Sequence, residues 1–276
     1  MTSAEAEARE PSSSTTFPLE TGAAPVESHE VGADGVTNSQ KNKLNHRNAW
    51  PYGNYRAYYT FRPASSSADA SSLPTPDELE GRLALLDPSL FRDKNLLDLG
   101  TNAGKIPLDA LQHFGAKSVT GVDIDPLLIE DSKVVARERG IEDDDVRCRF
   151  FAGDFMRPEW LAEFVQQQAE PFDVVTLFSV TKWLHLHNGD EGMERLYRSL
   201  YALLPPGGVV VIEPQEWDNY KRAVKKNKDL RETFKALKMR PPFEDEMKVA
   251  GFSLETRIER EEGGFSRPLL VWRKEA

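Results

Sequence analysis

Short apolar runs alternate with amphipathic stretches through the middle of the chain, from about residue 95 to residue 212. Turn-forming residues bound each run, whereas the stretches between the runs repeat their apolar residues at helical spacing. Strands that alternate with helices predict a parallel sheet with helices on both faces. The predicted strands are Asn95–Leu99, Ser118–Asp123, Val146–Ala152, Phe172–Phe178 and Gly208–Ile212, and the predicted helices are Lys105–Phe114, Pro126–Arg139, Pro158–Gln168 and Glu191–Leu204.

The segments on either side of this region extend the same domain. Residues 79–91 carry leucine and phenylalanine at helical spacing, which predicts a helix ahead of the first strand. Towards the C-terminus we predict a helix over Phe243–Ala250 and two strands, Phe252–Arg260 and Arg267–Arg273. These last strands are expected to add an antiparallel edge to the sheet.

The first forty residues have a different composition. Ser, Thr, Gly, Ala, Pro and Glu dominate there, and seven acidic residues against one basic residue account for a charge of -6 out of the net -10. Such a segment buries too little apolar surface to offset the entropy cost of ordering. We therefore predict a disordered acidic tail over residues 1–45 and a single α/β domain over residues 46–276.

The sequence also argues against a disulfide-stabilised protein and against a membrane-spanning one. The single cysteine, Cys148, cannot form an intramolecular disulfide, which fits a reducing compartment. The longest apolar runs, Val174–Val180 and Val209–Ile212, are too short to span a bilayer. We expect a soluble monomer that has no membrane partner.

A glycine-bounded turn follows the first predicted strand and carries the first chemical signal. The turn runs from Gly100 through Asn102 to Gly104, and Asp123 ends the next strand, where a carboxylate can accept hydrogen bonds from both hydroxyls of a ribose. Asn102 stands where the dinucleotide fingerprint has its second glycine, so the turn suits S-adenosylmethionine better than a pyrophosphate. The alternative is a tight strand-to-helix turn with an incidental acid.

Two further strand ends converge on the same edge of the sheet. Asp154 and Phe155, after the third strand, suit the amino group and ring face of an adenine. Residues 178–192 are predicted as a loop that offers Lys182, His185 and His187 beside Trp183, which is typical of a pocket for an anionic acceptor. The alternative, which the grouping with Trp183 makes weaker, is that these side chains are surface residues. Histidines two positions apart without a third ligand do not predict a zinc site.

Two segments are rich in cations or aromatic residues. Trp50–Arg62 holds six aromatic residues, and it either stacks on bases or a cofactor ring or simply packs against the domain. Tyr220–Arg240 is strongly basic: residues 219–240 contain nine basic and two acidic residues. The basic stretch is either a solvated amphipathic helix or a contact for a phosphate backbone.

Together these motifs resemble the bicoid-interacting-protein type of RNA methyltransferases. This family includes the methylphosphate capping enzyme of small nuclear RNA and relatives that act on 5′-monophosphate RNAs. The resemblance covers roughly residues 50–274. Its motifs are Asn54-Tyr55 through Tyr58-Tyr59 to Arg62, Asp98–Gly104, Gly121–Asp125 with Leu128-Ile129, Ser179–Leu186 with Gly189–Gly192, Pro206–Gly208, Glu213–Trp217 and Gly264–Pro268.

The resemblance implies a Rossmann-like seven-stranded class I fold and methyl transfer from S-adenosyl-L-methionine to a 5′-terminal phosphate of RNA, in the nucleus or cytoplasm. S-adenosyl-L-homocysteine would be the product, no metal is expected, and RNA-associated proteins would be further partners. It implies that the catalytic residues are Lys182, His185 and Tyr59. The implied cofactor-binding residues are Tyr55, Arg62, Gly100, Asn102, Gly104, Asp123, Asp125, Asp154, Phe155 and Phe178.

The sequence departs from the family pattern in two places. Thr101 stands where the family usually has cysteine, and His187-Asn188 where it commonly has Asn-Trp. The second departure leaves the preference between mono- and triphosphate ends open. Two other functions remain: an RNA-binding protein with little turnover, and a methyltransferase of a small molecule or a protein.

Overall fold

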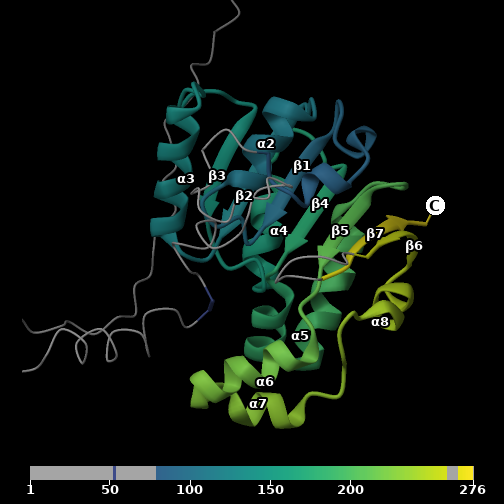
Figure 1. Cartoon of the computed structure of the whole chain (residues 1–276). Helices are drawn as coiled ribbons and strands as arrows, with labels where there is room; N and C mark the ends of the chain where they lie inside the picture. Colours follow the sequence, from purple (N-terminus) through teal and green to yellow (C-terminus); the bar gives the residue numbers. More distant parts are fainter. Residues whose placement is uncertain (1–51, 54–78, 260–266, 276) are drawn as a thin grey trace, which may run out of the picture. The chain divides into compact units, whose positions relative to one another are not determined.

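A seven-stranded sheet forms the centre of the domain (Figure 1). The computed structural model describes residues 52–53, 79–259 and 267–275, so the predicted tail over residues 1–45 lies outside the described residues. The strand order is β3-β2-β1-β4-β5-β7-β6, and β7 runs in the opposite direction to the other six strands. The strands are β1 (Asn95–Leu99), β2 (Ser118–Asp123), β3 (Cys148–Ala152), β4 (Val174–Phe178), β5 (Val209–Glu213), β6 (Phe252–Ile258) and β7 (Leu269–Lys274).

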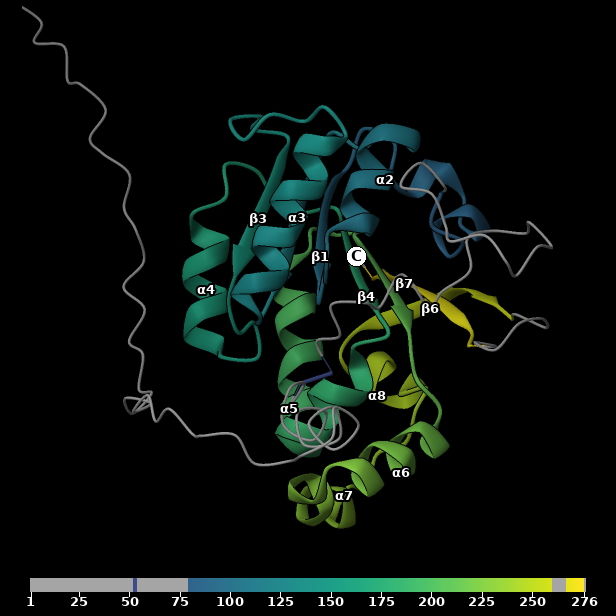
Figure 2. The same ribbon diagram turned by 60° about the vertical axis from the view of Figure 1, so that its left-hand side comes forward.

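Helices cover both faces of the sheet, as Figures 1 and 2 show. Alternate residues of each strand face opposite sides, so Leu97 and Leu96 belong to different buried clusters. The Leu96 face packs against α2 (Lys105–His113) and α3 (Pro126–Glu138). The Leu97 face packs against the other helices, which are α4 (Pro158–Gln166), α5 (Thr181–Leu203), α6 (Trp217–Lys226), α7 (Arg231–Ala236) and α8 (Glu244–Val249).

The predicted α/β fold class is confirmed, and the predicted strands lie within about two residues of the observed ones. The segment at residues 79–91 differs, because it forms two short 3-10 helices, η2 (Leu83–Leu85) and η3 (Pro88–Leu90), instead of an α-helix. Leu86 is extended and Asp87 begins a new turn by accepting the N–H of Ser89, which ends any continuous helix.

The segment predicted as a loop at residues 178–192 is mostly helical, which corrects that prediction. Helix α5 begins at Thr181, ten residues before the predicted start at Glu191. Its one non-helical residue is Gly189, with φ 67° and ψ -175°, a conformation that is essentially restricted to glycine. The glycine kinks the helix instead of preceding it.

The basic stretch is not one helix. Asn227 is extended and accepts the N–H of Asp229, so α6 ends at Lys226 and a 3-10 turn, η4 (Lys228–Leu230), leads into α7. We refer to residues 217–240 as the basic segment. Among the helices of the described ranges, none is long and apolar enough to cross a lipid bilayer.

Candidate functional site

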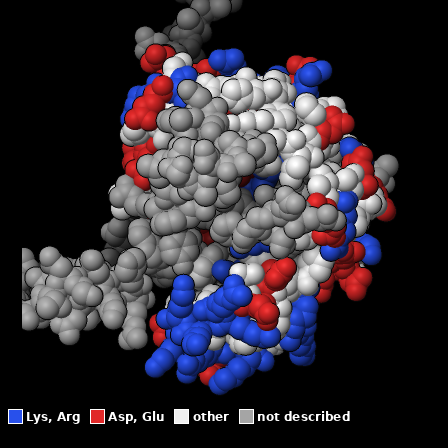
Figure 3. Space-filling model, in the orientation of Figure 1, with Lys and Arg blue, Asp and Glu red and all other residues white. Residues whose placement is uncertain are grey.

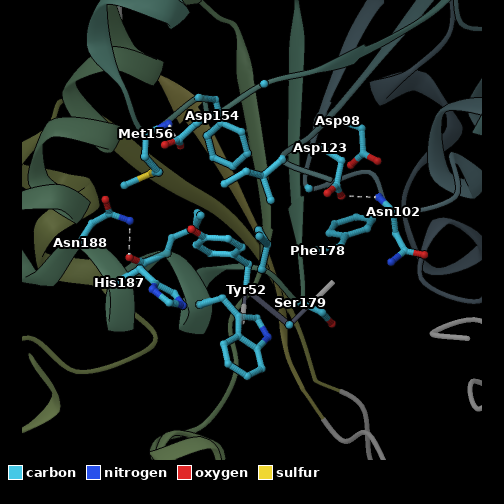
Figure 4. A pocket seen from close by; sticks show the side chains of 18 of the residues that line it. Tyr52, Asp98, Asn102, Asp123, Asp154, Met156, Phe178, Ser179, His187 and Asn188 are labelled. Carbon is cyan, nitrogen blue, oxygen red and sulfur yellow. Dashed lines mark hydrogen bonds between the residues drawn. The ribbon is translucent and has the colours of Figure 1, made fainter. Parts of the chain in front are cut away.

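A cavity of about 300 Å³ lies at the carboxyl ends of the parallel strands (Figure 4). Its lining comes from the segments that follow β1, β2, β3 and β4 and from the first half of α5, with Tyr52 and Gly53 added from the N-terminal side. Ligands of open α/β sheets bind at this edge. Figure 4 shows Asp98, Asn102 and Asp123 on one side of the cavity and His187 and Asn188 on the other.

Close backbone packing explains two glycines in this lining. Gly100 has a φ of +80°, and a Cβ there would lie 2.8 Å from Cγ2 of Val180. Gly53 has a φ of +74°, and a Cβ there would lie 2.0 Å from the indole nitrogen of Trp183. Only glycine fits at both positions. Gly104 is the N-cap residue of α2, has a φ of +76° and does not line the cavity.

Asp123 is held in place by the backbone of two turns. Its Oδ2 accepts the N–H of Asn102 at 2.9 Å and its Oδ1 accepts the N–H of Asp125 at 3.1 Å. Each oxygen keeps a second acceptor position, so the fixed carboxylate can receive two hydroxyl groups. Burial raises the pKa of Asp123, against the effect of these N–H donors. Asp125 does not line the cavity, and its side chain instead caps α3 through the N–H of Leu127.

Asp98 provides a buried carboxylate behind the glycine turn. Its Oδ1 accepts the Thr176 hydroxyl at 2.6 Å, whereas its Oδ2 has no hydrogen-bond partner among the described residues. Burial raises the pKa of Asp98 to about 6. An unsatisfied carboxylate in a cavity wall fits an ammonium group, such as that of an amino acid. Asp98 is not among the implied cofactor-binding residues, although the sequence pattern already favours Asp98 and Gly100 for S-adenosylmethionine.

The segment after β3 lines the opposite end of the sheet edge. Asp154 accepts the N–H of Met156 at 3.1 Å, which fixes the turn, and Phe155 is largely buried beside it. A Cβ on Gly153 would lie 2.0 Å from the Trp160 ring, so this turn packs directly on α4. The arrangement leaves an apolar wall with one carboxylate at its edge, which suits a polar aromatic ring.

Buried polar side chains at the end of β5 and just after it fix the start of α5. Ser179 has a φ of +60°, its hydroxyl donates to Glu213, and it accepts from Nη1 of Arg267 at 2.9 Å. Gln215 accepts the N–H of Lys182 at 2.9 Å and donates to the Ser179 carbonyl. The first turn of α5 is therefore capped by a side chain from another element.

Lys182 lies within a group of cations at this helix start. Its ammonium sits 4.2 Å from the centre of the Trp183 ring, and Trp183 lines the cavity. Burial, followed by the positive charges of Arg267 and Lys226, lowers the pKa of Lys182 to about 7. Lys182 itself is not part of the lining. The arrangement favours the approach of an anion, which would restore the charge on the amine.

His185 lies away from the cavity. The side chain is fully buried, Nε2 is 2.7 Å from Oδ1 of Asp190, and Nδ1 is 3.3 Å from the Tyr220 hydroxyl. Burial lowers the pKa of His185, although Asp190 opposes the effect. His185 does not line the cavity, and the catalytic role that the resemblance implies for it stays a prediction.

The predicted site residues therefore separate into three groups. Those that line the cavity are Gly100, Asn102, Asp123, Asp154, Phe155 and Phe178, and those that do not are Gly104, Asp125, Lys182 and His185. Tyr55, Tyr59 and Arg62 lie outside the described residues.

Two lining residues outside the predicted list form an aromatic contact. The rings of Tyr52 and His187 have centroids 4.8 Å apart. In the sequence, Tyr52 belongs to the aromatic-rich segment Trp50–Arg62, and His187 belongs to the group that includes Lys182. Within the residues that the structure describes, no group of three or more His, Cys, Asp or Glu side chains is placed to hold a metal.

The strand order, the antiparallel seventh strand and the carboxylates at the sheet edge define a class I S-adenosylmethionine-dependent methyltransferase. A family model of the methyltransferase domain matches residues 97–210. The model of Bicoid-interacting protein 3 (Bin3) matches residues 172–274. The U6 snRNA methylphosphate capping enzyme Amus of Drosophila melanogaster is 33% identical over 245 residues, which cover 81% of this chain and 74% of that protein. The chain belongs to the Bicoid-interacting protein 3 family.

Other relatives are more distant. The human 7SK snRNA methylphosphate capping enzyme is 25% identical, with 81% of this chain and 39% of that protein covered. The RNA 5'-monophosphate methyltransferase of Bos taurus is 28% identical, with 75% of this chain and 73% of that protein covered. The relatives thus include both snRNA methylphosphate capping enzymes and an RNA 5'-monophosphate methyltransferase.

Proposed function

We propose that this methyltransferase transfers the methyl group of S-adenosylmethionine to an oxygen of the 5′-terminal phosphate of RNA. The observation that carries the proposal is the half-buried amine of Lys182, 4.2 Å from the ring of the cavity residue Trp183, on which the positive charges of Arg267 and Lys226 also act. Like charges disfavour one another, and a phosphate that approaches Lys182 would balance them. The related enzymes named above supply the substrate class.

The cavity residues fit the cofactor. In this proposal Asp123 accepts the ribose hydroxyls, Asp98 accepts the ammonium group, and Asp154 with Phe155 binds the adenine, since all four residues line the cavity. The bound cofactor supplies an electrophilic methyl group on a sulfonium. The backbone N–H groups of Asn102 and Asp125 hold the Asp123 carboxylate in place before the cofactor arrives, which lowers the entropy cost of binding.

The acceptor requires little proton chemistry. A terminal phosphate oxygen is already anionic at neutral pH, so no strong general base is needed. The chain must align this oxygen and balance its charge. Lys182 can take up a proton as the phosphate approaches, and Tyr59, Tyr55 and Arg62 are proposed to complete the site, although they lie outside the described residues.

The basic segment gives the rest of the RNA a surface. Figure 3 shows Lys and Arg side chains gathered over α6 and α7. Arg222, Lys225, Lys226 and Lys228 are exposed there, and such a cluster is typical of contacts with phosphates. We also propose that the enzyme acts as a monomer in the nucleus, or in the cytoplasm, and meets RNA-associated proteins there.

The test supplies labelled S-adenosylmethionine with one RNA in three forms: 5′-triphosphate, 5′-monophosphate and 5′-hydroxyl. The proposal expects label on one or both phosphorylated forms and none on the hydroxyl form. Equal labelling of all three would contradict a terminal-phosphate acceptor. Tight RNA binding without any labelling would favour a protein that retains its RNA.

A further inference from the structure

His185 lies where three parts of the domain meet. It belongs to the first half of α5, which also carries the cavity residues Trp183, His187 and Asn188. Its ring packs edge-on against Tyr220 of α6 and against Phe243, which precedes α8. A fully buried imidazole at such a junction can hold the three parts of the domain together.

Asp190 extends this junction to the far end of the basic segment. Its Oδ2 accepts the N–H of Lys238 at 2.7 Å, and its Oδ1 accepts both the N–H of Met239 at 3.2 Å and Nε2 of His185. Burial opposes the charge, but these three donors lower the pKa of Asp190. The ionised carboxylate fixes the proton on Nε2, which leaves Nδ1 to accept the Tyr220 hydroxyl. His185 and Asp190 thus contact the basic segment near both of its ends.

The kink in α5 makes this arrangement possible. Gly189 adopts a conformation open to glycine, and a Cβ on Gly192 would lie 2.3 Å from Cβ of Asn188. The two glycines let the chain turn tightly enough for Asp190 to reach His185 and residues 238–239. The same turn carries Asn188, which lines the cavity. The cavity wall and the basic segment therefore share one anchor.

We propose that His185 and Asp190 form a clamp that sets the position of the basic segment relative to the cavity, so that an RNA held by the segment presents its end to the methyl donor. His185 is then a positioning residue, and it does not touch the substrate. This inference rests on the proposed function for its RNA ligand. Without the clamp, the terminal phosphate still fits the cavity, but the RNA backbone loses its aligned surface.

The experiment compares two ligands that share one 5′-phosphorylated end. The first is a dinucleotide, which offers almost no backbone to the basic segment, and the second is an RNA of about 25 nucleotides. His185→Phe keeps the aromatic packing and removes both hydrogen bonds, and Asp190→Asn is the milder second variant. His113→Phe, at an exposed position of α2, is the matched control.

Binding is measured by fluorescence anisotropy and methylation by label transfer, with S-adenosylmethionine affinity and melting temperature to verify the fold. The clamp predicts that Kd and KM for the long RNA rise about tenfold in both variants, while kcat and every value for the dinucleotide stay within twofold. His113→Phe should change nothing.

An equal loss of kcat on both ligands would overturn the proposal and make His185 a catalytic residue. Unchanged affinity for the long RNA would overturn it as well, because the clamp would then have no role in RNA placement. If the unaltered enzyme binds RNA but methylates neither ligand, the proposed function fails, and the anisotropy values still decide the clamp.

Discussion

The two sides of the cavity are built by different means. On the donor side, the carboxyl ends of β1, β2 and β3, the key contacts run from Asp123 to backbone N–H groups of nearby turns. On the acceptor side, around the start of α5, side chains bind side chains from distant elements, as Arg82 does with Glu213, 131 positions away. Backbone turns thus form most of the donor site, where Thr176 adds one distant side-chain contact to Asp98, and the tertiary fold forms the acceptor site.

The two sides should therefore tolerate different substitutions. A donor site made by backbone turns needs glycine and a few carboxylates, and the surrounding core can change without moving it. The acceptor side depends on a buried polar network in which each member satisfies another. Substitutions on the donor side should therefore act on cofactor affinity alone, and substitutions in the network should act on stability and on the acceptor.

The largest effect is expected for Asp123→Ala. Two ribose hydroxyl bonds to a charged acceptor contribute about 2 kcal/mol each, so S-adenosylmethionine should bind about a thousandfold more weakly, as calorimetry would measure. RNA affinity should stay within twofold. Asp125→Ala is the control, because its carboxylate caps α3. A tenfold loss of cofactor affinity in the control would contradict the division between these two acids.

Glu213→Gln tests the acceptor side. Both partners of the Arg82–Glu213 pair are buried, so loss of the carboxylate leaves a guanidinium partly uncompensated, and the free energy of unfolding should fall by about 3 kcal/mol. Urea denaturation measures it. Glu255→Gln removes an exposed partner of Arg273 and should cost less than about 1 kcal/mol. Equal losses in the two variants would remove the contrast between buried and exposed pairs.

The same division explains how far the sequence could predict the molecule. Strand β1 is buried along its whole length and β2 along all but its first residue, so both could be located to the residue. The start of α5 could not, because Gln215, a later residue, caps it and the polar residues before Gly189 are typical of a loop. The burial of His185 could not be predicted either, because it depends on contacts with Tyr220 and Asp190 that no local sequence pattern indicates.

The charge state of Lys182 gives a further test of the acceptor side, because it should control the affinity for a phosphate. The free amine has a pKa of about 7, lowered from 10.5, so it is mostly charged below pH 7 and mostly neutral above it. A bound phosphate raises this pKa, which means that binding takes up a proton above pH 7. Affinity for a 5′-phosphorylated RNA should then fall up to tenfold from pH 7 to pH 8.

Proton uptake can be measured by calorimetry in buffers of different ionisation enthalpy. Lys182→Arg is the control, since a guanidinium stays charged throughout and should abolish both the uptake and the fall in affinity over this range. If the affinity of Lys182→Arg depended on pH to the same extent, the titrating group would be the phosphate and not Lys182.

The smallest effect should come from Lys225→Ala in the basic segment. Lys225 is exposed on α6, where the basic side chains gather (Figure 3). Losing one phosphate contact should weaken RNA binding about threefold near 0.1 M salt and reduce the slope of log K against log salt by about 0.7 to 0.9. Lys133→Ala, on α3, should leave the slope unchanged. Because a solvated helix face would give two identical slopes, the pair decides whether the acceptor side extends from the cavity to the RNA backbone.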